Sequence, residues 1–259
     1  MLIIRNDQIK TLEEFALNDF ENELVEHCKK FAPKHSEVIE ESGVREVVRL
    51  GIKRAENYGL TNRGPVRFYV EMMFMFGSDF DTDFQMPWAG GVLNNEAIAD
   101  QTQRADILHD KMLEYLEQVS GPDDKYSLDA LRRLNQSGAE DYNLTKQDFD
   151  RQMAAALRSI YPQKCEYLGE ELLGTLIQRG KDLARSHSIT SENGIGLIIA
   201  LMLALGHGFA ADQLFPWVSK TLADESIAEP NERAERLQKK MKIYLDQALK
   251  YLEERRNNV

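Results

Sequence analysis

Residues 77–88, GSDFDTDFQMPW, recur in altered form as residues 206–217, GHGFAADQLFPW. Both stretches fit the pattern G-x-x-F-x-x-D-x-x-x-P-W, and they lie 129 positions apart. The match extends without a gap from residues 19–119 to residues 148–248, with 26 identities over the 101 aligned positions. A self-match at one fixed offset is the sequence signature of a repeated folding unit. The sequence therefore predicts a tandem duplication.

Apolar residues recur at three- and four-residue spacing through both units, which is the pattern of amphipathic helices. In the first unit the pattern predicts helices over about 10–31, 38–58, 62–76, 87–94 and 100–119. In the second unit it predicts helices over about 145–160, 166–187, 191–206, 215–223 and 230–255. No segment carries a convincing strand pattern. We predict an all-α fold made of two stacked five-helix repeats, residues 1–119 and 147–259, joined by a helical connector, residues 120–146.

Local signals predict where several of these helices begin and end. Pro33 should end the first helix, because proline cannot continue a helix. Gly59 stands where a left-handed residue would end the second helix, and Gly77 should end the third. Thr61 is a plausible N-cap for the third helix.

Composition limits the possible partners of the chain. The 259 residues carry a net charge of −11 and give a pI of about 5.1. Nucleic-acid binding depends on cationic side chains that neutralise phosphates, so the acidic balance argues against it and against docking on anionic lipid. The most apolar run, residues 195–205, is shorter than the roughly 20 residues that span a bilayer, so we predict no membrane insertion.

The expected location is cytoplasmic. The first residues, MLIIRNDQIK, lack the basic segment and long apolar run of a secretory signal. Cys28 and Cys165 occupy non-equivalent places in the two units and form no C-x-x-C pair. Reduced, structural thiols in a reducing compartment are the expected state.

The repeated motif has a structural explanation in both units. The glycine ends a buried helix, the phenylalanine turns into the core, and the aspartate binds loop amides or caps the next helix. The proline opens a short helix, and the tryptophan fills the space beneath the loop. We assign this structural role to Gly77, Pro87, Gly206, Phe209, Asp212, Pro216 and Trp217. The alternative is a tryptophan-lined groove for a partner.

The first unit adds acidic residues to this loop. Asp79, Asp81 and Asp83 stand at alternate positions, like the start of a calcium-binding loop. Phe84 stands where such a loop needs its glycine, and Gly90 stands where it needs its bidentate glutamate. We therefore predict no metal site, and we interpret the loop as a solvated acidic patch or a contact for a basic partner.

Catalytic signatures are missing from the sequence. The five histidines form no metal-binding pattern, and no P-loop, G-x-G-x-x-G or G-x-S-x-G is present. No cofactor is predicted. Glu71 lies within an apolar helix, where we expect it at the rim; the alternative is burial beside Arg67, one turn earlier.

Residues 51–89, GIKRAENYGLTNRGPVRFYVEMMFMFGSDFDTDFQMPWA, resemble a family of small bacterial proteins that share the segments GI-RA--YG-T and G--FD-D---PWA. The resemblance covers about 40 residues of the first unit; the second unit keeps the frame and lacks the acidic loop. Genes of this family lie near type VI secretion genes. The resemblance implies a role in that setting and assigns no catalytic residue.

We expect a non-catalytic module that binds another protein. By the resemblance it would be an effector chaperone or adaptor, or an immunity protein, with a secreted effector as its partner. The predicted contact surfaces are the junction between the units and the acidic loop with its tryptophan, namely Asp79, Phe80, Asp81, Asp83 and Trp88. The alternative is a metal-dependent helical hydrolase that uses the three aspartates of the loop. A structural homo-oligomer is a third possibility.

Overall fold

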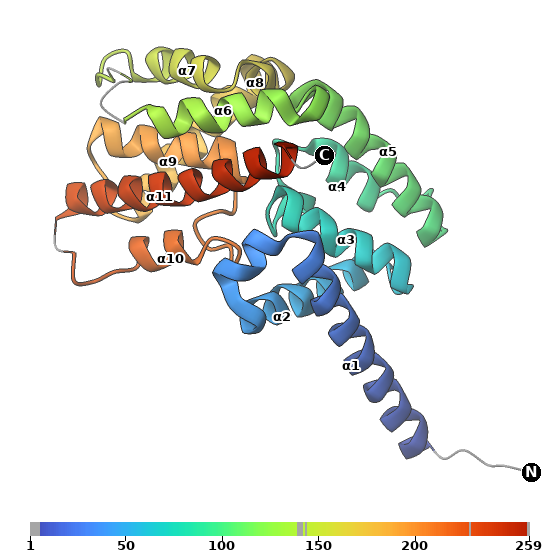
Figure 1. Ribbon diagram of the computed structural model, residues 1–259. Helices are drawn as coiled ribbons and strands as arrows, with labels where there is room; N and C mark the ends of the chain where they lie inside the picture. Colours follow the sequence, from blue (N-terminus) through green and yellow to red (C-terminus); the bar gives the residue numbers. More distant parts are fainter. Residues whose placement is uncertain (1–5, 139–141, 143, 228, 258–259) are drawn as a thin grey trace, which may run out of the picture.

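The computed structural model describes residues 6–138, 142, 144–227 and 229–257, shown in Figure 1. This part of the chain contains eleven α-helices and no strand, which confirms the all-α prediction. Residues 139–141 and 143, at the end of the predicted connector, lie outside the described residues.

The first half of the chain forms five helices, α1 (Asn6–Phe31), α2 (Pro33–Asn57), α3 (Arg63–Phe76), α4 (Pro87–Leu93) and α5 (Gln101–Val119). A 3-10 turn, Phe80–Thr82, lies between α3 and α4, and a second one, Pro122–Asp124, precedes the connector helix α6 (Lys125–Gln136). The second half forms α7 (Phe149–Ile160), α8 (Pro162–Ser186), α9 (Glu192–Leu205), α10 (Pro216–Leu222) and α11 (Pro230–Asn257). Helices α2 to α5 each begin 129 positions before one of the helices α8 to α11.

Helices α1, α2 and α8 begin four or five residues earlier than the sequence predicted, and α1 begins at Asn6, not near residue 10. Helix α2 starts at Pro33 and α8 at Pro162, not near residues 38 and 166. Proline fits the first turn of a helix because its missing N–H has no intrahelical acceptor there. Pro33 therefore opens the next helix as well as following the end of the first. The backbone then kinks at Glu40 (φ 58°) in α2 and at Gly169 (φ 66°) in α8.

The predicted helix ends are mostly confirmed. Gly59 has φ of 71° after the last residues of α2, and Gly77 ends α3 with φ of 97°. The predicted cap at Thr61 is wrong, because the residue before α3 is Asn62 and its side chain makes no capping bond. The backbone N–H of Thr61 instead donates to Gln101 Oε1, 2.7 Å away on α5.

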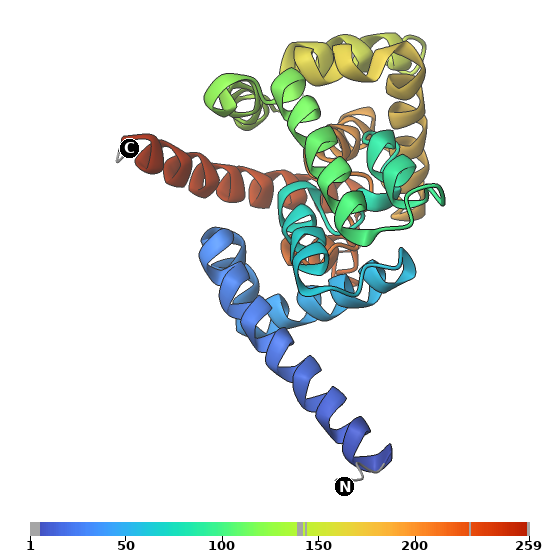
Figure 2. The same ribbon diagram turned by 90° about the vertical axis from the view of Figure 1, so that its right-hand side faces the viewer.

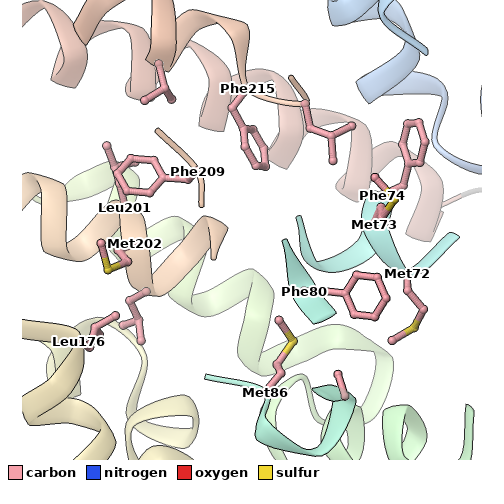
Figure 3. Close-up of a cluster of buried hydrophobic side chains, with 14 of the residues drawn as sticks. Met72, Met73, Phe74, Phe80, Met86, Leu176, Leu201, Met202, Phe209 and Phe215 are labelled. Carbon is pink, nitrogen blue, oxygen red and sulfur yellow. The ribbon is translucent and has the colours of Figure 1, made fainter. Parts of the chain in front are cut away.

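Buried apolar side chains from both halves form one continuous core, part of which is shown in Figure 3. Helices α3 and α9 supply much of it: Met72 and Met73 from α3, Leu201 and Met202 from α9. Helix α9 contains the run at residues 195–205, and residues 196–203 of that run are buried. No helix of the described residues combines the length and the apolar character needed to cross a bilayer.

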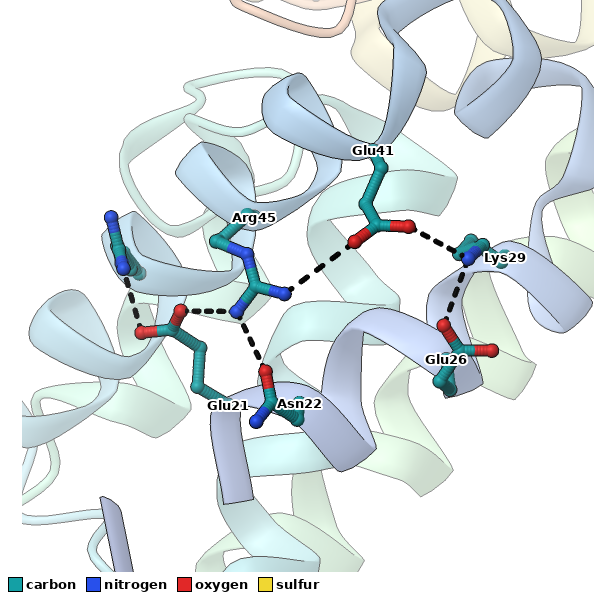
Figure 4. Close-up of polar contacts among 7 residues, drawn as sticks. Glu21, Asn22, Glu26, Lys29, Glu41 and Arg45 are labelled. Atoms are coloured by element: carbon teal, nitrogen blue, oxygen red, sulfur yellow. Dashed lines mark hydrogen bonds and ion pairs between the residues drawn. The ribbon is translucent and has the colours of Figure 1, made fainter. Parts of the chain in front are cut away.

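Helix α1 packs on α2 only through its C-terminal part, while its N-terminal part projects from the body (Figures 1 and 2). Glu21 Oε1 lies 2.7 Å from Arg45 Nη1, a contact drawn in Figure 4. Glu21 Oε2 lies 2.9 Å from Arg49 Nε. Burial would raise the pKa of Glu21, but hydrogen bonds and charge from the two arginines lower it. On the projecting part, Phe15 is 72% exposed.

Candidate functional site

The two copies of the motif meet at the centre of the molecule. The loop between α3 and α4 lies against the loop between α9 and α10, and each contributes an aspartate to the other. Asp212 Oδ2 accepts a hydrogen bond from the backbone N–H of Ser78 at 2.7 Å. Asp83 Oδ2 accepts one from the backbone N–H of His207 at 2.9 Å. Each aspartate thus binds the first amide beyond the glycine that ends the other half's buried helix.

Gly77 and Gly206, the glycines of the two motif copies, lie where the backbones of α3 and α9 come very close to each other. A Cβ atom on Gly77 would lie 3.0 Å from the carbonyl oxygen of Leu205, and one on Gly206 would lie 3.0 Å from that of Phe76. Both residues also have φ above 90°, which side chains disfavour. The C-terminal ends of α3 and α9 can abut only because neither position carries a side chain.

The five residues predicted to contact a partner differ in their exposure to solvent, and three of them are buried. The side chains of Phe80, Asp81 and Asp83 are 1%, 6% and 3% exposed. Asp79 is partly exposed and lies 2.5 Å from Arg54 Nη2. Trp88 is half-buried against Phe76 and Tyr115. In this arrangement the loop therefore offers a partner little beyond Asp79 and one edge of Trp88, and it is not a solvated acidic patch.

Most of the residues assigned a structural role are buried or stand at a helix boundary. Phe209 and Asp212 are buried, and the rings of Trp217 and Tyr244 lie 5.5 Å apart. Pro87 and Pro216 are the first residues of α4 and α10. The Nε1 atoms of both tryptophans are buried without a hydrogen-bond partner among the described residues.

Each aspartate of the acidic loop has its own partners. Asp79 pairs with Arg54, and Asp83 accepts from the amides of His207 and Gln85. Asp81 Oδ2 accepts from the hydroxyls of Tyr58 and Tyr69, at 2.9 and 2.7 Å. Within the described ranges, no three His, Cys, Asp or Glu side chains are placed to share a metal ion. The loop geometry therefore gives the hydrolase alternative no shared carboxylate site.

Asp81 also affects the titration of its neighbours. Burial and, after it, the hydrogen bond to Asp81 together raise the pKa of Tyr58 to about 12. The pKa of Tyr69 is also raised, first by burial and then by the charge of Asp81. Both hydroxyls therefore stay protonated and act as donors near neutral pH.

Replacing Asp81 by alanine is expected to destabilise the protein by about 2–3 kcal/mol, because two buried hydroxyls lose their acceptor. The hydrolase alternative expects unchanged stability with loss of activity. Urea unfolding monitored by circular dichroism separates the two. Asp106→Ala, on the exposed face of α5, is the control and should stay within about 0.5 kcal/mol of the parent protein. Unchanged stability of the Asp81 variant would contradict the structural role.

The sequence left two environments open for Glu71, an exposed position at the rim and a buried one beside Arg67, and the structure places it between them. Its side chain is 19% exposed, and Oε1 lies 3.5 Å from Arg67 Nε. A closer partner is His27 of α1, whose Nε2 lies 2.6 Å from the same oxygen. Sequence reasoning identified Arg67, four residues away, but could not identify a partner 44 positions away. The contact ties α1 to α3.

Three adjoining hollows lie along the junction of the two halves. The first, about 330 Å³, lies between α3, α9 and α11, and the second, about 430 Å³, extends it towards the connector helix α6. We call these two the central cavities; they share Met75, Phe76, Leu131 and Ala204 as wall residues. The third, about 520 Å³, lies between the corner where α1 meets α2 and the C-terminal half of α11. We call it the α11 cleft.

Two basic side chains line the central cavities, and sequence reasoning missed both. Lys164 of α8 is 7% exposed, and its Nζ donates to the carbonyl oxygen of Leu203 at 2.6 Å. His35 of α2 stands 129 positions earlier, and its Nδ1 is buried without a hydrogen-bond partner among the described residues. Burial lowers the pKa of Lys164 and lowers that of His35 to about 4. The only available signal was a basic residue at the same aligned position of both units.

No family model, no curated protein and no solved structure matches this chain.

Proposed function

We propose that the protein is a non-catalytic module that binds another protein, and that the α11 cleft is its contact surface. The cleft carries this proposal because it is an open groove between helices with apolar walls. Phe31 and Val38 on its walls are 38% and 40% exposed. Grooves of this kind accept the apolar face of an amphipathic helix from a partner.

The rim of the α11 cleft carries charges of both signs. Lys34 and Lys250 lie beside Glu37 and Glu254 among the residues that line it. Lys34 Nζ lies 2.6 Å from Glu37 Oε2 and 5.7 Å from the ring centre of Tyr251, which links the two walls. An apolar floor with a mixed polar rim is typical of protein interfaces. We thus propose these residues as the part of the junction between the halves that contacts a partner.

We also propose that the two halves descend from one duplicated five-helix module. Matching helix starts support this: α2 and α8, α3 and α9, α4 and α10, and α5 and α11 each begin 129 positions apart. The residues with positive φ support it too, since Glu40 pairs with Gly169 and Gly59 with Ser188 at the same offset. The two halves differ at the α11 cleft. Helix α11, which forms one wall of the cleft, is nine residues longer than its counterpart α5 (28 against 19).

The setting proposed from the sequence resemblance is type VI secretion in the bacterial cytoplasm. There the partner would be a secreted effector, and the protein its chaperone, its adaptor or its immunity protein. A chaperone or adaptor should be required for export of the effector. An immunity protein should instead restore growth of cells that produce the effector.

The experiment is affinity capture of the tagged chain from its native host, with the bound protein identified by mass spectrometry. Val38→Asp, which places a charge on the wall of the cleft, should abolish capture of that protein. Leu113→Asp is the matched control, because Leu113 is a 49% exposed leucine on α5 outside the cleft. Equal capture by both variants would refute the assignment of the cleft.

A further inference from the structure

The central cavities have the size and composition of a ligand site. Their volumes, about 330 and 430 Å³, fall in the range of small-molecule pockets, which are mostly apolar with a few placed polar groups. Their walls come from both halves of the chain and from the connector, with Phe74, Phe215, Leu131 and Leu252 among the apolar residues. The central cavities could therefore bind the hydrocarbon part of a ligand between the two halves.

Lys164 places a cation at the wall shared by both cavities. Its ammonium has three N–H donors, and the Leu203 carbonyl takes one of them. No carboxylate of the described residues lies within ion-pair distance of Nζ, and Asp83 acts on it only as a more distant charge. Burial of a cation without a paired anion is costly. An anionic group entering the cavity would remove that cost.

His35 adds a second polar group to the same cavity. Its ring lies edge-on to Phe74 and Phe215, at centroid distances of 6.4 and 5.8 Å, so the aromatic rings fix its orientation. The unpartnered Nδ1 can donate to an acceptor within the cavity in one of its two tautomers. Lys164 and His35 are thus two donors from different halves that face one apolar space.

We propose that the central cavities bind a small apolar monocarboxylate, with its carboxylate held by Lys164 and His35 and its hydrocarbon body against the walls. The donors suit one negative charge: a single ammonium and a single imidazole, with no arginine among the lining residues. Phosphate recognition generally uses several cations or arginine forks, which these walls lack. This proposal concerns a different occupant from the partner helix proposed for the α11 cleft, although His35, Tyr244, Ala248 and Leu252 line both hollows.

Octanoate is the probe, and octanol, which has the same chain without the carboxylate, is its matched comparison. Trp88 and Trp217 are the two tryptophans of the chain, and their rings contact Tyr115 and Tyr244, which line the cavities. Tryptophan fluorescence should therefore report binding. We expect saturable binding of octanoate at least about tenfold tighter than that of octanol, an effect in the range of one charged hydrogen bond. Absence of saturable octanoate binding would overturn the proposal.

Lys164→Met keeps the length of the side chain and removes the charge. In this variant the preference for octanoate over octanol should fall to about onefold. Lys220→Met, an exposed lysine on α10, should keep the full preference. A Lys164 variant that still prefers octanoate as strongly as the parent protein would overturn the proposal.

Lys164 also binds a carbonyl near the end of α9, so its replacement could prevent folding. Ala204→Phe provides the second test, because Ala204 lines both central cavities and the added ring would occupy them. This variant, if folded by circular dichroism, should bind neither octanoate nor octanol. Unchanged octanoate binding would place the ligand elsewhere and overturn the proposal.

Discussion

Replacing Asp212 by alanine is expected to lower the free energy of unfolding by about 4 kcal/mol. Its carboxylate accepts three hydrogen bonds in a buried position: from the Ser78 amide at 2.7 Å, the Ser78 hydroxyl at 2.6 Å and the Leu214 amide at 2.9 Å. Each buried donor left without an acceptor costs about 1–3 kcal/mol. Burial of the carboxylate opposes this stabilisation, which is why the pKa of Asp212 is raised. The estimate is therefore below the sum of three full penalties.

Asp83→Ala should cause a loss of similar size, because Asp83 accepts from the amides of His207 and Gln85. Ser78→Ala is the control, since it removes one hydroxyl and leaves both amide bonds to Asp212 in place; its loss should be about 1 kcal/mol. Urea unfolding of the three variants measures the series. If Asp212→Ala is no less stable than Ser78→Ala, the two aspartates do not hold the halves together.

The self-match of the sequence predicted much of what lies at the centre of this fold. Identities at matched positions fall on residues with matched contacts. Arg104, for example, binds the carbonyl oxygens of Tyr58 and Ile98, and Arg233 binds those of His187 and Ile227. Local chemistry also predicted the helix ends at Gly59 and Gly77, since the need for positive φ is local. Such features can be predicted because they depend on residues near in sequence or aligned with each other.

Contacts between distant positions could not be predicted. No sequence pattern indicates that Asp83 and Asp212 bind amides of opposite halves, 124 and 134 positions away. The sequence therefore predicts an exposed acidic loop, whereas Asp81 lies buried under two tyrosines that stand on α3 and at the end of α2. Exposure depends on how the helices pack, and helical periodicity does not determine that packing.

The candidate site was the least predictable feature. Lys164 and His35 differ in residue type, so an alignment that counts identities ignores them. The α11 cleft forms where the C-terminal half of α11, a longer helix than its counterpart α5, lies beside the corner of α1 and α2. Periodicity can predict the length of a helix. It cannot predict which other helices the additional turns will contact.

Acidification is expected to destabilise the protein through His35. Burial alone lowers the pKa of His35 from its usual 6.5 to about 4, because the ring lies among apolar and aromatic side chains. The folded state thus favours neutral His35, and unfolding takes up a proton at pH values between 4 and 6.5. The stability that His35 contributes is fully present above pH 6.5 and is lost as the pH falls towards 4. Linkage gives a loss of about 2.5 kcal/mol at pH 4.5.

His35→Phe isolates this effect, because phenylalanine has a similar shape and does not titrate. The variant should match the parent protein within about 1 kcal/mol at pH 7.5 and exceed its stability by about 2.5 kcal/mol at pH 4.5. Urea unfolding at both pH values gives the comparison. Asp212, whose raised pKa favours the folded state on acidification, and His187, whose lowered pKa acts as His35 does, are present in both proteins and cancel. His109→Gln, at a half-exposed position on α5, should follow the parent protein.

Parallel loss of stability in His35→Phe and the parent protein would mean that His35 is hydrated or charged in the folded state. That result would also bear on the central cavities, because a hydrated imidazole would have water on Nδ1, which the structure leaves without a partner among the described residues. A bound carboxylate should act in the opposite direction to burial, since a nearby negative charge raises the pKa of a histidine. At about pH 5.5, where octanoate is still mostly ionised and the pKa values of unfolded and folded His35 still lie on either side, saturating octanoate should therefore reduce the acid-induced loss in the parent protein. The difference from His35→Phe should shrink with it.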